Sequence, residues 1–267
     1  MNKSNISRND LKRNFLKEII MRLDFQGVFT TEMENVLVTV KPYLKEKSFT
    51  RYEQKITNQI VTEGNIPEVK SQVVHVFTAE SSGFMLELST SYILLTVSTQ
   101  SYASFEGYAS IFCHIADIYR TKIDFFTTKR FGLRKINFCF VKDKTKITKY
   151  FSESYYNCEE PISEFTTKES TRSDKLFDGK HNINMNYAVE EGTLGEEIVY
   201  KITLDSDIYL SAQNDIEQVV FEETALKDIN EKLFRIYLNV ITDDLIEILI
   251  RDQEPSSDEI LGVDDNV

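Results

Sequence analysis

Two arginines flank a glycine in the segment KRFGLRKINFCF, residues 129–140, just before an apolar run. The guanidinium groups of Arg130 and Arg134 can each bind a carboxylate or a phosphate through two parallel hydrogen bonds. Lys135 and Asn137 follow within three residues and add further hydrogen-bond donors. These side chains predict either a site for an anion or, for Arg134, a structural ion pair with an acidic residue of the neighbouring repeat.

A second basic group, Arg13 and Lys17, precedes a similar apolar run near the N-terminus. With an offset of 117 residues, Arg130 aligns on Arg13 and Arg134 aligns on Lys17. If the two runs are neighbouring strands, these basic side chains repel one another unless acids such as Asp24 lie between them. We therefore expect Arg134 to have a carboxylate partner and Arg130 to face a binding partner.

Residues typical of catalysis do not cluster in the sequence. His75, His114 and His181 are scattered, and none has a second ligand at a spacing typical of metal sites. The nine glycines form no phosphate-binding loop, and no serine or cysteine stands in a known nucleophile motif. The sequence predicts no catalytic residue, metal or cofactor, and it favours a protein that is not an enzyme.

The elements that must position the basic residues follow from hydrophobic periodicity. LKEIIMRLDF, residues 16–25, alternates between apolar and polar side chains, as a half-buried strand does. TTEMENVLVTVKPYL, residues 30–44, has helical spacing, with Thr31 and Glu34 as a capping box. SYASFEGYASIFCHIADIYR, residues 101–120, is an amphipathic helix. Four further strands are predicted at residues 48–60, 69–80, 83–89 and 91–98.

The pattern begins again at a shift of 116 to 117 residues. LRKINFCFV, residues 133–141, matches the opening strand, and FEETA, residues 221–225, matches FEGYA, residues 105–109. ITLDSDIYLS resembles ELSTSYILLT, which predicts a hairpin around Ser206 equivalent to the one around Thr90. The second long helix continues to Val240, and Thr242 can cap a restart.

We therefore predict an α+β fold built from a duplicated β-α-β-β-β-β-α unit. Two units side by side form a curved antiparallel sheet with helices on one face, similar to the saddle of the TATA-binding-protein-like fold. Residues 1–125 are the first repeat and residues 126–251 the second, together one pseudo-symmetric domain. Polar residues 158–180 predict an irregular edge, and residues 252–267 a disordered acidic tail.

Charge is distributed unevenly along the chain. The net charge is −12, with 31 basic and 43 acidic residues. Residues 1–150 hold 22 basic and 15 acidic side chains, a balance of +7, and residues 151–267 hold 9 and 28, a balance of −19. This division indicates a charged partner or a solvated basic edge, and the acidic total disfavours nucleic acid.

The longest apolar run, YILLTV, is far shorter than the roughly 20 residues of a membrane span, and the N-terminus has no apolar leader segment. The three cysteines, Cys113, Cys139 and Cys158, are widely spaced and predict reduced thiols. We expect a cytoplasmic protein that does not bind membranes.

A short motif in the second repeat resembles the R-x-G-L-R-Y-I-N signature of a sporadically distributed family of uncharacterised bacterial and archaeal proteins. The matching residues are Arg130, Gly132, Leu133, Arg134, Ile136 and Asn137. Lys135 departs from the signature, which has tyrosine there, so a stacking role at this position does not carry over. The family's scattered distribution implies a prokaryotic accessory protein of a defence or toxin-antitoxin system, without a known activity.

Three functions are compatible with these observations. The first is a non-catalytic interaction protein that binds a protein partner through the exposed sheet face and its charge-split surface, with a homodimer also compatible. The second is a saddle that binds nucleic acid through the basic first halves of the repeats. The third is a receptor or enzyme for a small anion, centred on Arg130, Arg134 and Asn137. We predict the first function.

Overall fold

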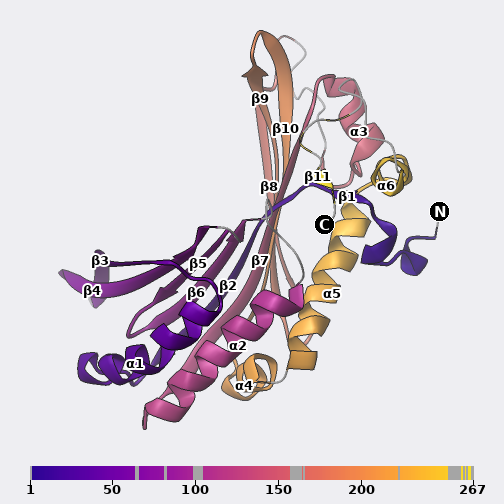
Figure 1. The fold of residues 1–267 in the computed structure, drawn as a ribbon. Coiled ribbons are helices and arrows are strands. Elements are labelled where there is room, and N and C mark those ends of the chain that lie inside the picture. Colours follow the sequence, from indigo (N-terminus) through magenta and orange to yellow (C-terminus); the bar gives the residue numbers. More distant parts are fainter. Residues whose placement is uncertain are drawn as a thin grey trace. The chain divides into compact units, whose positions relative to one another are not determined.

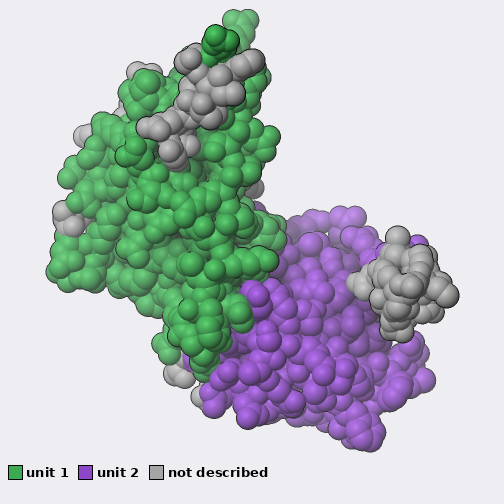
Figure 2. Space-filling view, turned by 180° about the vertical axis from the view of Figure 1, so that it is seen from behind, with its two compact units in different colours: residues 1–18, 134–208, 228–267 green, residues 19–133, 209–227 purple. Residues whose placement is uncertain are grey.

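The computed structural model describes residues 2–63, 66–80, 83–98, 105–156, 164, 166–221, 223–251, 260, 262 and 264–265. The chain divides into two compact units, coloured separately in Figure 2. Unit 1 consists of Met1–Glu18, Arg134–Ile208 and Asp228–Val267, and unit 2 of Ile19–Leu133 and Tyr209–Lys227. Each unit therefore combines stretches that lie far apart in the sequence.

The protein is an α+β protein with a large antiparallel sheet, which confirms the predicted fold class at this level (Figure 1). Within the described ranges the sheet has nine strands in the order β3-β4-β5-β6-β2-β7-β10-β9-β8. The strands are β2 (Leu16–Gln26), β3 (Arg51–Glu63), β4 (Ile66–Ala79), β5 (Phe84–Leu88), β6 (Tyr92–Ser98), β7 (Thr127–Val141), β8 (Glu169–Phe177), β9 (Asn182–Leu194) and β10 (Glu197–Leu210). As predicted, the two basic strands β2 and β7 are neighbours.

Six α-helices accompany the sheet in the part of the chain that the structure describes. They are α1 (Thr30–Glu46), α2 (Phe105–Lys122), α3 (Ile147–Tyr150), α4 (Gln213–Phe221), α5 (Glu223–Val240) and α6 (Asp243–Ile250). Three 3-10 turns are η1 (Lys3–Asn5), η2 (Arg8–Asp10) and η5 (Lys144–Lys146). A separate pair of short strands joins β1 (Arg13–Asn14) to β11 (Asp264–Asp265).

Unit 2 has the packing that its periodicity predicts. Its part of β2 buries every second side chain, and α1 and α2 lie on the same face of its sheet (Figure 1). The ring centroids of Phe112 on α2 and Phe131 on β7 lie 5.8 Å apart, so α2 covers the face of β7 that carries Phe131. The buried helix side chains include the predicted Met33, Val36, Leu37, Val40, Phe105, Tyr108, Phe112, Ile115 and Tyr119.

Unit 1 has an aromatic core. The ring of Phe15 lies 5.9 Å from Phe151 and 5.0 Å from Tyr237 on α5. Helix α5 ends at Val240, and the Thr242 side chain caps α6 by accepting a hydrogen bond from the backbone of Leu245. The predicted restart of the helix at Thr242 is therefore confirmed.

Two local predictions are wrong. The predicted capping box of Thr31 and Glu34 does not form, because α1 begins at Thr30 and the Glu32 carboxylate accepts from the Phe29 amide at 2.8 Å. No hairpin forms at Ser206, since residues 197–210 are one continuous strand. The alternation of Leu204, Ser206 and Ile208, all buried, continues straight through the segment that resembles a turn.

The predicted orientation of β7 is also wrong. Alignment on β2 places Ile136, Phe138 and Phe140 on the core face. In the structure these three side chains are only half-buried, and the buried residues of this strand are Thr128, Phe131, Gly132, Leu133, Asn137, Cys139 and Val141. Both faces of the strand are apolar after residue 135, so alternation alone does not choose between them.

Candidate binding site

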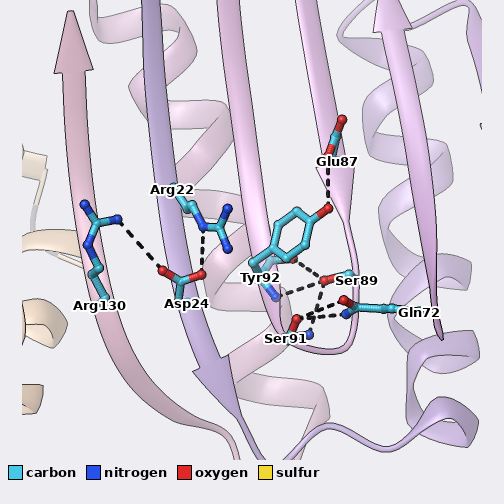
Figure 3. Close-up of polar contacts among 8 residues, drawn as sticks. All are labelled: Arg22, Asp24, Gln72, Glu87, Ser89, Ser91, Tyr92 and Arg130. Carbon is cyan, nitrogen blue, oxygen red and sulfur yellow. Dashed lines mark hydrogen bonds and ion pairs between the residues drawn. The ribbon is translucent and has the colours of Figure 1, made fainter. Parts of the chain in front are cut away.

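A group of charged side chains lies on the face of the unit 2 sheet opposite α1 and α2 (Figure 3). Arg22 and Asp24 are two residues apart on β2 and therefore share a face. Arg22 Nε donates to Asp24 Oδ1 at 2.7 Å, and Arg130 Nη1 on β7 lies 3.9 Å from Asp24 Oδ2. One carboxylate thus faces two guanidinium groups, as the sequence predicts for neighbouring basic strands.

Tyrosines flank this charged group on both sides. The Arg22 guanidinium lies over the Tyr92 ring, 4.6 Å from its centroid, and the Arg130 guanidinium lies 4.7 Å from the centroid of Tyr209. The four residues come from neighbouring strands β6, β2, β7 and β10. Cation–π contacts of this kind restrict the orientation of the guanidinium groups. We call Tyr92, Arg22, Asp24, Arg130 and Tyr209 the arginine row.

The corner between β5 and β6 positions Tyr92. Ser89 Oγ accepts from the backbone amides of Ser91 and Tyr92 at 3.2 and 2.9 Å, as in a tight turn closed by a side chain. Gln72 Nε2 donates to Ser91 Oγ at 2.8 Å and so joins β4 to the corner (Figure 3). The predicted hairpin around Thr90 is confirmed, and its consequence is a fixed backbone at Tyr92.

Tyr92 also contacts an acidic residue. Its hydroxyl donates to Glu87 Oε2 at 3.0 Å. Burial and then the Glu87 charge raise the pKa of Tyr92 to about 12, so it remains a neutral donor near neutral pH. Val76, Glu87 and Leu94 pair directly across β4, β5 and β6, and Val74, Val76 and Tyr92 form a small apolar cluster. The face therefore combines a small buried apolar cluster with the charged arginine row.

The chemistry available to the arginine row is recognition. Arginine does not release its proton in proteins, so neither guanidinium can act as an acid or a base. Two positive groups share one carboxylate, and Arg130 meets it at 3.9 Å, beyond hydrogen-bonding distance. Guanidinium groups bind carboxylate and phosphate oxygens through paired donors, so these are the ligand groups that suit the arginine row.

Arg134, the central residue of the sequence motif, makes a different contact in unit 1. Its Nε and Nη2 atoms donate to the two oxygens of Asp205 at 2.7 and 2.6 Å, which confirms the predicted carboxylate partner. This hydrogen bond raises the pKa of Arg134, while burial opposes it. Asp205 lies on β10 of the same predicted repeat, and the two side chains are 44% and 13% exposed. The expected pairing with the neighbouring repeat, fully buried, is therefore wrong.

Lys135 and Asn137 lie on the opposite face of β7 from Arg134. Asn137 is buried and its Nδ2 donates to the Leu204 carbonyl at 3.3 Å. Burial, and then the charge of Arg8, lowers the pKa of Lys135 well below its usual value, against the opposing charge of Glu231. These two residues of the motif therefore do not share a site with the Arg134 guanidinium.

Arg13 and Lys17 contact the C-terminal part of unit 1. Arg13 Nη1 donates to the Arg251 carbonyl at 2.6 Å, and Lys17 Nζ donates to the Gly262 carbonyl at 2.7 Å. Asp264 and Asp265 pair with β1, and Ile260 is 2% exposed. Residues 260, 262, 264 and 265 are those described within the predicted tail 252–267, and their contacts differ from those of a disordered segment.

The histidines and cysteines lie apart from the arginine row. His75 is buried and its Nδ1 lies 2.9 Å from the Tyr52 hydroxyl, while the His114 ring packs on Tyr43. Cys113 and the buried Cys139 are free thiols, and Cys158 lies outside the described residues. Among the residues that the structure describes, no group of three or more His, Cys, Asp or Glu side chains is arranged to hold a metal ion.

Sequence reasoning named Arg130 as a site residue but missed Tyr92 and Tyr209. Both tyrosines alternate with buried apolar residues, in Tyr92-Ile93-Leu94-Leu95 and Ile208-Tyr209-Leu210. The signal was the strand parity, which places Tyr209 on the face opposite Ile208. Without the strand order, no pattern connects either ring to an arginine.

Comparisons with known proteins give no family. No protein-family model and no curated protein matches the chain. Among solved structures, the Pct1 RNA triphosphatase of S. pombe, in complex with the Spt5 CTD, is 5% identical, with 85% of this chain and 86% of that chain covered. The TM-score is 0.15, too low for any conclusion about fold or function. In the described part of the chain, no helix is both long and apolar enough to cross a membrane.

Proposed function

We propose that the protein is a non-catalytic interaction module that binds an acidic segment of a partner protein through the arginine row. The observation that carries the proposal is the position of Arg130, stacked on Tyr209 and 3.9 Å from a carboxylate that Arg22 already holds. Tyrosine and arginine are the residue types that most often dominate protein interfaces. Met85 and Leu94, which are partly buried and pack against the buried cluster of Val74, Val76 and Tyr92, supply the adjoining apolar surface.

A protein partner fits this face better than nucleic acid. The chain has a net charge of −12, and Asp24 and Glu87 lie among the arginines and tyrosines of the same face. Nucleic acid binds through many phosphates at once and needs positive charge accumulated along a surface, whereas a short acidic segment can pair with the two guanidinium groups of the arginine row alone. Nucleic-acid binding therefore remains the second candidate for the same face.

Duplication and the saddle are part of the same proposal. The order of strands is nearly symmetrical about β2 and β7, since β6, β5 and β4 follow one of them and β10, β9 and β8 the other. This order supports a duplicated unit, although the predicted hairpin at Ser206 does not contribute to it. We also propose, from the resemblance to the R-x-G-L-R-Y-I-N family, that the protein has an accessory role in prokaryotes.

Calorimetric titration with an oligoglutamate peptide tests the function. We expect the peptide to bind, an oligoglutamine peptide of equal length not to bind, and Arg130→Ala to weaken binding by about tenfold, the effect of losing one charged hydrogen bond. Arg120→Ala, on α2 and paired with Asp117, is the matched control and should bind like wild type.

Other outcomes separate the alternatives. Unchanged binding by Arg130→Ala contradicts the proposal. Equally strong binding of inorganic phosphate favours the small-anion receptor, and binding of a single-stranded oligonucleotide with a steep salt dependence favours the nucleic-acid alternative.

A further inference from the structure

Strand β3 forms an edge of the sheet in unit 2. It pairs with β4 in one unbroken register from Arg51 opposite Thr78 to Glu63 opposite Ile66, and no strand pairs with its other side in the described part of the chain. A long edge strand presents a row of backbone donors and acceptors to any second strand. Edge strands of soluble proteins are usually protected by proline, a bulge, short length or charged side chains. This 13-residue strand, RYEQKITNQIVTE, has charged side chains but no proline, bulge or short length.

The first half of β3 is also exposed on its side-chain faces. Residues 51–56 are all exposed, and they include Tyr52 at 42% and Ile56 at 74%. Ile56 lies directly opposite Val73 on β4, another exposed apolar side chain. The strand therefore offers both unpaired backbone groups and apolar side chains.

The sequence of this exposed half is complementary to itself. In an antiparallel pair of two copies centred on Gln54, Tyr52 lies opposite Ile56 and Glu53 lies opposite Lys55, twice each by symmetry. An aromatic side chain opposite a β-branched one, and opposite charges across the strands, are both stabilising cross-strand pairs. Shifting the register by one residue in either direction places Glu53 opposite Gln54 or Ile56 and loses the charge pairing.

Glu53 and Lys55 lie on one face of β3 and already form an ion pair with each other within one copy. Lys55 Nζ lies 2.9 Å from Glu53 Oε1 two residues earlier in the same strand. In the paired arrangement, two glutamates and two lysines alternate around the axis, so each charge has two opposite neighbours. Gln54 and the apolar pairs lie on the other face, because neighbouring residues of a strand point to opposite sides.

We propose that the occupant of this edge is a second copy of the chain, and that β3 pairs antiparallel with β3 of that copy about a twofold axis at Gln54. The sheet of unit 2 then continues into the second copy, and the exposed Tyr52 and Ile56 side chains are covered. This dimer goes beyond the proposed function, because it uses the edge of the sheet and leaves the arginine row to other partners.

Charge reversal tests both the dimer and its register by sedimentation velocity over a concentration series. Wild type should dimerise, and Glu53→Lys and Lys55→Glu should each weaken the dimer by about tenfold or more, since two attractions become two repulsions. An equimolar mixture of the two variants should form a heterodimer, and the double variant carrying both changes should dimerise with itself again.

Matched controls come from α1, where Lys45 and Glu46 are exposed. Lys45→Glu and Glu46→Lys make the same changes of net charge away from the edge and should dimerise like wild type. In hydrogen exchange, the backbone amides of residues 51–57 that point away from β4 should be protected in the wild-type dimer, less protected in each single variant and protected again in the mixture.

Three results would overturn the inference. They are a wild-type protein that stays monomeric across the series, a dimer that is insensitive to both charge reversals, and single variants that fail to associate when mixed. A dimer that also weakens in the Lys45→Glu control would show dependence on total charge rather than on this edge.

Discussion

The ion pair of Arg134 with Asp205 has ideal two-point geometry but lies partly in solvent, with the arginine 44% exposed. Arg134→Ala should therefore lower the free energy of unfolding by only about 1 to 2 kcal/mol, less than the loss expected for a fully buried pair. The remaining Asp205 carboxylate, 13% exposed, accounts for most of this loss. Urea denaturation measures the difference.

Arg51→Ala serves as the matched change for this measurement. Arg51 pairs with Glu80 at 3.2 Å, and the two side chains are 69% and 66% exposed, so the loss of this pair should cost less than about 0.5 kcal/mol. Equal effects of the two substitutions would show that solvent screens Asp205 as completely as Glu80.

Asp24 competes with any anionic ligand for the two guanidinium groups of the arginine row. Asp24→Asn keeps the shape of the side chain but removes its charge, so an oligoglutamate peptide should bind roughly fivefold more tightly. Calorimetry measures the change, and Asp117→Asn on α2, which contacts Arg120 alone among the arginines of the described residues, is the control. Weaker binding by Asp24→Asn would mean that the carboxylate orients the arginines for the ligand rather than competing with it.

At the level of elements, the turn between β8 and β9 is joined to α5 by three titratable side chains. His181 Nδ1 lies 3.0 Å from Lys232 Nζ and 3.1 Å from Asp178 Oδ2, and Lys232 donates to the same Asp178 oxygen. Burial and then the Lys232 charge lower the pKa of His181 from 6.5. Burial tends to raise the pKa of Asp178, but hydrogen bonds from Lys232 and two backbone amides outweigh it and lower the pKa.

These shifts give a direction to the pH dependence. A histidine with a lowered folded pKa binds its proton more readily when unfolded, so stability decreases as pH falls below the unfolded value of 6.5. Asp178 contributes stability above its unfolded value of 3.8 and loses it only as pH falls through its lower folded pKa. The free energy of unfolding should therefore decrease between neutral pH and about pH 5, through histidine alone.

Urea denaturation as a function of pH, with His181→Asn as the variant, checks this direction. The variant should show a smaller decrease than wild type. Some decrease should persist, since burial also lowers the pKa of His75. His114→Asn, on the surface of α2 beside Tyr43, serves for comparison. A steeper decrease in His181→Asn than in wild type would contradict the assignment.

The C-terminal residues described near β11 also have a measurable role. Ile260 is 2% exposed, so Ile260→Ala should lower the free energy of unfolding by about 2 kcal/mol or more, through lost burial and a residual cavity. Thermal or urea unfolding of this variant measures the loss, and Val38→Ala, which shortens a 74% exposed side chain on α1, is the control. A wild-type value for Ile260→Ala would support the disordered tail that the composition predicts.

Elements with one apolar face were predictable from sequence, and elements with two were not. In β2, charged residues such as Arg22 and Asp24 mark the solvent side, and in α2 the spacing from Phe105 to Tyr119 defines a single buried stripe. Strand β7 is apolar on both sides after Lys135, so its orientation depends on which helix covers it. Strand β10 holds Asp-Ser-Asp in its middle, a turn signal that the pairing with its neighbours overrides.

The candidate site was predictable only in part for a related reason. The sequence identifies Arg130 and Asp24, because basic side chains on adjacent strands require an acid between them. The tyrosines under the two arginines belong to β6 and β10, and only the strand order brings them to β2 and β7. Long-range order of this kind is not a property of any local pattern.

For the molecule as a whole, the net charge predicts how the protein behaves toward a polyanion such as heparin. With a net charge of −12 and acids interspersed in the arginine row, the protein should pass through a heparin column without retention at physiological salt. Retention that falls steeply with added salt would contradict this expectation, and loss of that retention in Arg130→Ala would assign it to the arginine row.

Unit 1 is assembled from three separate stretches of the sequence, and this affects the order in which it can fold during synthesis. Arg13 Nη1 donates to the Arg251 carbonyl, a partner 238 residues further along the chain. Phe15, fully buried in the finished protein, packs on Tyr237. During translation this N-terminal segment leaves the ribosome long before Tyr237 and Arg251 are synthesised. Its apolar side chains remain exposed to solvent until then. The core of unit 1 is therefore completed only after Tyr237 and Arg251 have been synthesised, and until then the apolar N-terminal segment is available to a ribosome-associated chaperone.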